Sequence, residues 1–311
     1  MPTADSPDVI EDTIRKHDDL LDVLLLDRTR TTARKSHNIL WATNSYPGHN
    51  PKSEISIDDI TGDNTNLIQP RIAKSREEQK RRSQEKAEVF TPRWMVNQMN
   101  QQTDWNCGHW PVTEDNWQDY VSELRLEITC GEAPFIVGRY NAASGKKVLK
   151  LSDRVGFLDR KLQVVSKYCH DKADWLQWAI VAFQCSYGYE WQGDNLLLAR
   201  ENLLYTFIDY WNDKFPDDQI DLDQQLSENK ANILRQINEV ISWNIFQMDG
   251  INYIVPMSGT VSPETPEVPP LLSMLGERHA KPKHKKPIYV KIMDWRKRKT
   301  IKFIDIVKGK K

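Results

Sequence analysis

The stretch LRLEITCGEAPF, residues 124–135, decides the fold class of this chain. Apolar and polar residues alternate from Leu124 to Ile128, which is typical of a short strand, and Gly131 permits the tight turn that follows. We expect a helix to begin near Pro134, because proline is favoured in the first turn of a helix. A strand, a tight turn and a helix in this order begin an α/β unit.

Predicted strands adjoin predicted helices at two further places along the chain. The sequence predicts a strand over residues 185–190 with a long amphipathic helix over residues 194–211, and a helix that leads into a strand over residues 243–247. Two further strand-like segments, residues 287–295 and 300–307, follow near the end. Repeated strand–helix units imply a mostly parallel, doubly wound α/β sheet.

Upstream of the sheet the sequence predicts helices. One is expected within residues 9–29, a strongly charged and mostly exposed one over residues 73–89, and one after Pro92. The expected organisation is an N-terminal helical segment (1–89), a cofactor-binding α/β domain (90–257), a Pro-rich, charged linker (258–287) and basic C-terminal strands (288–311).

Composition excludes several classes of protein. The 311 residues are 39% hydrophobic and 28% charged, which is a globular balance, and no apolar run approaches the roughly 18 residues of a membrane span. The N-terminus lacks a signal-peptide core, so we expect a cytoplasmic protein without a membrane contact. The four cysteines stand far apart without zinc-ligand spacing, so we expect reduced thiols and no metal site.

Charge is distributed unevenly along the chain. Residues 281–311 contain thirteen lysines and arginines against two acids, whereas the rest of the chain has 30 basic and 42 acidic side chains. Clustered cations are rewarded by contacts with phosphates, so Arg296, Lys297, Arg298 and Lys299 are candidate DNA-binding residues. Charge alone leaves a solvated tail as the alternative.

Three acids stand at or just after the carboxyl ends of predicted strands, where open α/β sheets bind their ligands. Glu127 precedes the turn at Gly131, Glu190 ends the second strand, and Asp249 follows the third. A carboxylate at the second position is suited to accept hydrogen bonds from both ribose hydroxyls of a nucleoside cofactor. The alternative for any one of them is a helix cap or a surface carboxylate.

Four segments of the chain resemble, in sequence and in order, the motifs of a known enzyme family: VFTPRWMVNQM (89–99), LEITCGEAPF (126–135), YGYEWQGDNLLLARENLL (187–204) and NIFQMDG (244–250). They resemble motifs X, I, II and III of the adenine-specific DNA methyltransferases of restriction–modification systems, including the modification parts of type I and type IIG enzymes. Together with GFLDRKLQVV (156–165) they are similar to proteins labelled restriction endonuclease subunit M.

This resemblance implies a Rossmann-like fold that binds S-adenosylmethionine. It implies that Phe90, Thr91 and Pro92 line the methionine end of the cofactor, and that Glu127, Cys130 and Gly131 form the turn beside it. It further implies that Glu190 binds the ribose and Asp249 the adenine. The chain departs from the family pattern at Glu127, Glu132 and Ala133, which replace the usual Asp, Ser and second Gly.

The catalytic motif of the family, Asn-Pro-Pro-Tyr or Asp-Pro-Pro-Tyr, does not occur in this sequence. That loop holds the flipped adenine, so we expect no catalytic residue here and no methylation by this chain alone. The leading hypothesis is the cofactor-binding modification subunit of a split adenine-specific DNA methyltransferase, whose partner chain carries Asn-Pro-Pro-Tyr and recognises the target. We expect this partner to dock at an unpaired sheet edge near residues 287–307.

The alternative function is a catalytically dead methyltransferase-like protein that binds DNA or acts as a scaffold in a defence or anti-restriction assembly. GFLDRKLQVV also has two interpretations. Asp159, Arg160 and Lys161 either position a phosphate or the partner, or take part in a buried structural ion pair.

Overall fold

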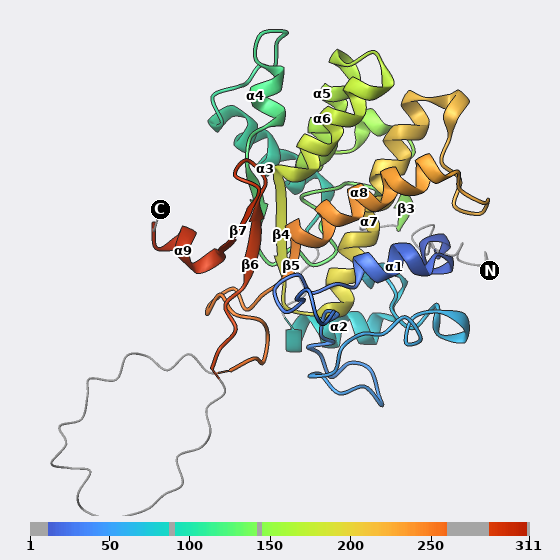
Figure 1. Ribbon diagram of the computed structural model, residues 1–311, viewed down its shortest axis with the longest axis vertical. Coiled ribbons are helices and arrows are strands. Elements are labelled where there is room, and N and C mark those ends of the chain that lie inside the picture. The colour runs from blue at the N-terminus through green and yellow to red at the C-terminus, as the bar shows by residue number, and fades with distance from the viewer. Residues whose placement is uncertain (1–11, 87–90, 142–144, 260–285, 310–311) are drawn as a thin grey trace, which may run out of the picture.

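The computed structural model describes residues 12–86, 91–141, 145–259 and 286–309, and its centre is a small parallel sheet. Three strands, β1 (Arg125–Glu127), β4 (Ser186–Glu190) and β5 (Ile245–Gln247), pair in that order (Figure 1). The three predicted strands are therefore confirmed, and the chain has a mixed α/β fold. Phe90 and nearly all of the predicted linker, residues 258–287, lie outside the described residues.

Helices connect the strands and extend the fold upstream. A helical pair, α5 and α6, crosses from β1 to β4, and α7 and α8 cross from β4 to β5. The elements besides the sheet, in chain order, are α1 (Asp18–Leu24), α2 (Arg76–Lys86), α3 (Arg93–Asn106), α4 (Trp117–Val121), β2 (Tyr140–Asn141), β3 (Lys146–Lys147), α5 (Phe157–Tyr168), α6 (Lys172–Gln184), α7 (Gly193–Lys214), α8 (Glu228–Asn244), β6 (Lys291–Asp294), β7 (Lys299–Lys302) and α9 (Phe303–Val307).

The main core lies between the crossover helices and the sheet. Trp175 and Trp211 are fully buried in it, and Leu21 and Leu24 of α1 belong to the same cluster. Arg200 of α7 fixes the N-terminal segment to this core, because its guanidinium donates to the carbonyl oxygens of Leu24 and, at 3.0 Å, Leu26. The N-terminal helical segment thus packs into the α/β core (Figure 1).

The face of the sheet that carries Tyr189 and Phe246 is covered by a β-hairpin of β6 and β7 (Figure 1). Val290 and Ile292 are buried against these rings, and burial of an aliphatic side chain of this size contributes about 1.5–3 kcal/mol. The hairpin is further held by Tyr187, whose hydroxyl lies 3.0 Å from the carbonyl oxygen of Met293.

Two sequence-based expectations are therefore corrected at the C-terminal end. The segments 287–295 and 300–307 do contain strands, but β6 and β7 pair antiparallel with each other, and the second segment continues as α9. The hairpin packs its apolar side chains on the face of β4 and β5 and is not a strand of the parallel sheet. Residues 287–307 therefore do not form the open edge of the parallel sheet at which a partner was expected to dock. Within the described residues, β1 and β5 are the two edge strands of the sheet. The carbonyl oxygen of Ile245 in β5 accepts from Arg200 at 2.8 Å, whereas the outer edge of β1 has no such partner in the described parts of the chain.

The charged helix predicted over residues 73–89 is α2, and it is exposed over most of its surface, as expected. Arg82 is the exception, with 1% of the residue exposed. Within the described parts of the chain, no helix has the length and apolar character needed to cross a membrane.

Candidate functional site

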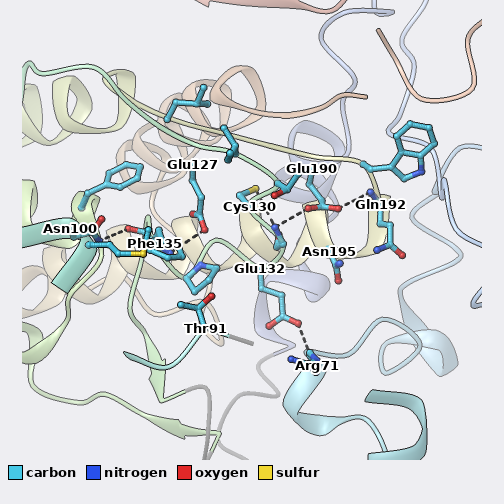
Figure 2. A pocket seen from close by; sticks show the side chains of 18 of the residues that line it. Arg71, Thr91, Asn100, Glu127, Cys130, Glu132, Phe135, Glu190, Gln192 and Asn195 are labelled. Carbon is cyan, nitrogen blue, oxygen red and sulfur yellow. Dashed lines mark hydrogen bonds between the residues drawn. The ribbon is translucent and has the colours of Figure 1, made fainter. Parts of the chain in front are cut away.

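A cleft of about 1530 Å³ lies at the carboxyl ends of β1 and β4. Its floor is formed by the turn after β1 and by the first residues after β4, and its sides come from α2, α3 and the outer edge of β1 (Figure 2). Parallel α/β sheets bind ligands at this end of their strands, because the turns there can approach a ligand with free backbone groups.

The turn after β1 has an unusual backbone. Thr129, Gly131 and Ala133 have φ angles of 46°, 53° and 65°, which lie in the left-handed region. Only glycine adopts this region without cost, and a residue with a Cβ pays about 1–2 kcal/mol. Left-handed non-glycine residues concentrate at functional sites, so this turn is a candidate site on conformation alone.

The helix expected near Pro134 is absent, and this expectation is wrong. The amides of Ile136 and Val137 return to the carbonyl oxygen of Ala133, at 3.1 and 2.9 Å, and the turn ends there. It cannot continue as a helix, because the next amide, of Gly138, donates to the Asp159 carboxylate at 2.6 Å. The chain instead forms the β2–β3 hairpin before α5 begins at Phe157.

Glu127, at the end of β1, stabilises this turn through its side chain. Its two carboxylate oxygens accept from the amides of Phe135 and Ile136, at 3.3 and 3.2 Å. Burial raises the pKa of Glu127 well above its usual value, while the two amide hydrogen bonds oppose that rise. Glu127 lines the cleft (Figure 2), and each of its carboxylate oxygens accepts one hydrogen bond from the backbone of the turn.

Glu190, at the end of β4, joins the two halves of the cleft floor. One carboxylate oxygen accepts from the amide of Gly131 at 2.9 Å, and the other accepts from the amide of Gln192 at 3.1 Å (Figure 2). The residue is only 7% exposed, and this burial raises the pKa of its carboxyl. A carboxylate has about four acceptor positions, so Glu190 can still accept a hydrogen bond from a ligand.

The cleft is lined by more acids than bases. Its carboxyl groups belong to Glu85, Glu123, Glu127, Glu132 and Glu190. Its two guanidinium groups are those of Arg71 and Arg125, and Arg125 is buried at 2.7 Å from Asp104. Without Glu127, whose pKa burial raises well above its usual value, four carboxyl groups still stand against two guanidinium groups, and this balance favours a cationic ligand over a phosphate.

The structure brings most of the sequence-derived cofactor residues together. Those that line the cleft are Thr91, Glu127, Cys130, Gly131 and Glu190. Pro92 stands at the start of α3 and is outside the set that lines the cleft. Asp249 is also outside it, because its carboxylate caps the turn after β5, accepting from the amides of Ile251 and Asn252 at 2.9 and 3.1 Å.

Three residues that follow Glu190 also line the cleft and were missed by the sequence reasoning. Trp191 is 36% exposed, and its indole nitrogen donates to the carbonyl oxygen of Ala42 at 3.0 Å. Gln192 and Asn195 come from the start of α7, beside Glu190 (Figure 2). A signal was present, because residues that directly follow a ligand-binding strand end belong to the same turn.

The segment GFLDRKLQVV forms most of α5 and has a structural role. Asp159 and Lys161 are fully buried, and Lys161 donates to the carbonyl oxygens of Glu123 and Cys185, which precede β1 and β4 at the amino ends of these two strands. Arg160 forms an ion pair with the buried Asp104 at 2.8 Å. The interpretation as a buried structural ion pair therefore fits this segment.

The candidate DNA-binding residues occupy the exposed tip of the β6–β7 hairpin. Arg296 donates to the carbonyl oxygen of Ser122 at 2.9 Å, and Lys297 lies 3.8 Å from Asp294. Arg298 and Lys299 are exposed. Among the residues with described positions, no group of three or more His, Cys, Asp or Glu could hold a metal ion.

Comparisons with known proteins identify no relative of this chain. No protein-family model, curated protein or solved structure matches the chain.

Proposed function

We propose that this chain is the S-adenosylmethionine-binding subunit of a split adenine-specific DNA methyltransferase. The observation that carries the proposal is the acidic cleft at the carboxyl ends of β1 and β4, in which Glu190 is fixed to the amide of Gly131 at 2.9 Å. The four sequence motifs that resemble methyltransferase motifs supply the identity of the ligand.

The charge of the cleft suits this cofactor. S-adenosylmethionine carries a sulfonium and an ammonium group and has no phosphate, so a surplus of carboxylates attracts it. Nucleotides with phosphates need free backbone amides or basic side chains. Here the amides of Gly131, Phe135 and Ile136 already donate to carboxylates, which disfavours nucleotide phosphates in this turn.

Neighbouring residues suit the nucleoside. In this proposal Glu190, which lines the cleft, accepts from the ribose through an acceptor position that the turn amides leave free, as the resemblance implies for this residue. Trp191 offers a partly exposed indole, held by its bond to Ala42, on which an adenine ring can stack. Asp249 caps its own turn outside the cleft, so in this proposal it does not read the adenine.

The second reactant requires another chain. The sequence contains no Asn-Pro-Pro-Tyr loop to hold a flipped adenine, so the proposed partner contributes that loop and the recognition of the target. DNA is proposed to contact the hairpin tip, since its exposed cations suit phosphates and the acidic cleft repels them.

The test is calorimetric titration of the full chain with S-adenosylmethionine, on the wild type and on two variants. Glu190→Gln keeps the shape of the side chain and removes its charge, so affinity is expected to fall by about 1.5–3 kcal/mol, the range of charge-assisted hydrogen bonds. Asp249→Asn is the matched control and should bind like the wild type. Equal losses in both variants would show that the cofactor does not sit on Glu190.

One observation favours a second candidate, a methyltransferase-like scaffold that has lost its cofactor. Burial raises the pKa of Glu127 well above its usual value, so this acid favours its neutral form and does not offer a full negative charge to the ammonium group of a ligand. A folded wild-type chain that produces no heat with S-adenosylmethionine, yet binds DNA, would support the scaffold and exclude the cofactor-binding subunit.

A further inference from the structure

The outer edge of β1 carries backbone groups that have no partner among the described residues. β1 pairs with β4 through Arg125 and Glu127, whose backbone groups point toward that strand. The backbone groups of Leu124, Leu126 and Ile128 point the other way, and no hydrogen bond joins them to any residue in the described parts of the chain. A row of unmet donors and acceptors is a template for an added strand.

The side chains along the same edge are apolar and exposed. Leu124, Leu126 and Ile128 are 58%, 42% and 65% exposed, whereas the alternate residues Arg125 and Glu127 are buried on the helical side. Soluble proteins usually protect a free edge with charges, proline or a bulge. Three exposed aliphatic residues at alternate positions of an unpaired edge strand are instead typical of a surface that a partner covers.

The surrounding elements leave this edge open as a groove. The β6–β7 hairpin covers the same face of β4 and β5 and reaches the β1 side with Arg296, which bonds to Ser122 ahead of the strand. On the outer side stands α3, whose Met99 is 53% exposed. Met99 and Thr103 line one cleft together with the edge of β1, so the groove is accessible.

Carboxylate side chains at the two ends of the groove favour a positively charged occupant. Glu123 lies at the amino end of β1 and lines the cleft with a side chain that is 27% exposed, and its Oε2 is 3.8 Å from Nε2 of His109. Glu85 and Glu132 line the cleft that continues past the carboxyl end of β1. Carboxylates at both ends attract a basic segment and repel the phosphates of a nucleic-acid strand.

We propose that the groove between β1 and α3 binds an extended segment of a separate polypeptide, which adds a fourth strand to the sheet. This segment has apolar residues at alternate positions to cover Leu124, Leu126 and Ile128, and a lysine or arginine that pairs with Glu123. The proposal goes beyond the proposed function, because strand addition at this edge does not require the cofactor.

The probe is a library of short peptides displayed on phage and selected against the immobilised full chain. The expected selected sequences alternate apolar and polar residues and carry a basic residue at one end. Leu126→Lys places a charge on the edge and should weaken binding of a selected peptide at least about tenfold. Ile251→Lys is the matched control, since Ile251 is 86% exposed beyond β5, and should bind like the wild type.

Backbone pairing is tested with N-methylated versions of a selected peptide. Methylation of one alternate set of amides should abolish binding and methylation of the other set should not, because only one set faces β1. Failure to select any peptide, an equal effect of both sets, or an unchanged affinity in Leu126→Lys would overturn the proposal. Self-association of the wild type that Leu126→Lys abolishes would overturn it in favour of a second copy of this chain.

Titration with S-adenosylmethionine separates this proposal from the proposed function. A wild-type chain that binds both the selected peptide and the cofactor supports both proposals. A wild-type chain that binds the peptide and never binds the cofactor supports the strand-addition surface alone, and one that binds the cofactor while no peptide is selected supports the proposed function alone.

Discussion

Replacement of Arg82 by methionine tests how α2 is held against the cleft. Arg82 is the buried residue of an otherwise exposed helix, and its guanidinium lies 2.6 Å from the carboxylate of Asp194 in the first turn of α7. The side chains of this pair are 1% and 0% exposed. An isolated helix as short as α2 is marginal in water, so its position depends on this ion pair.

The size of the effect follows from what remains around Asp194. Removal of one member of a buried ion pair usually costs about 3–5 kcal/mol, because the other charge stays buried. Asp194 keeps the hydroxyl of Tyr46 at 2.8 Å, and its place at the start of α7 contributes about 0.3–1 kcal/mol. We therefore expect Arg82→Met to lower the free energy of unfolding by about 3 kcal/mol, at the lower end of that range.

The assay is urea unfolding of the full chain, arranged as a double-mutant cycle with Asp194→Asn. The double variant should be more stable than the sum of the single losses implies, with a coupling energy of about 2 kcal/mol. Arg81→Met is the control on the same helix, because Arg81 is exposed and its replacement should change stability by less than about 0.5 kcal/mol. Additive losses, or equal losses at Arg81 and Arg82, would refute this account of α2.

Three further predictions concern other parts of the molecule. Burial lowers the pKa of Lys161 from 10.5 to about 7, so between these two pH values the unfolded chain binds one proton more than the folded chain. The free energy of unfolding should therefore rise with pH, and urea unfolding should show the wild type gaining about 2 kcal/mol relative to Lys161→Met from pH 7 to pH 9. Thr129→Gly relieves a left-handed φ of 46° at an exposed position and should raise stability by up to about 1 kcal/mol in the same assay, with a decrease contradicting the strain. Replacement of Arg296, Lys297, Arg298 and Lys299 by glutamine should reduce the steepness of the plot of log K for DNA binding against log salt concentration. The slope should change by about 0.9 for each phosphate that the hairpin tip no longer neutralises, whereas an unchanged slope would assign the tip to another role.

The sequence predicted the three strands of the parallel sheet because these strands and the helices that connect them have strong local patterns. Residues 185–190 and 194–211 became β4 and α7 with small changes of boundary, since alternation and a long amphipathic repeat are local signals. The failure at Pro134 has a different origin. The amide of Gly138 is captured by Asp159, twenty-one residues along the chain, and such a contact has no local signal.

The site was predictable in part for the same reason. Glu127, Gly131 and Glu190 stand directly at strand ends, so parallel pairing was enough to bring them into one cleft. Asp249 also follows a strand, yet its carboxylate turns back to cap the amides of Ile251 and Asn252, which depends on the local turn. The open edge of β1 was missed, because it follows from where the C-terminal hairpin packs.

The central claim is that the cleft at the ends of β1 and β4 selects a cationic nucleoside without phosphates. The most direct measurement is calorimetric titration of the full wild-type chain with S-adenosylmethionine and, under the same conditions, with adenosine triphosphate. The carboxylates that line the cleft, and the turn amides already bonded to Glu127 and Glu190, predict saturable heat with the first ligand and none with the second. Binding of adenosine triphosphate alone would contradict the claim.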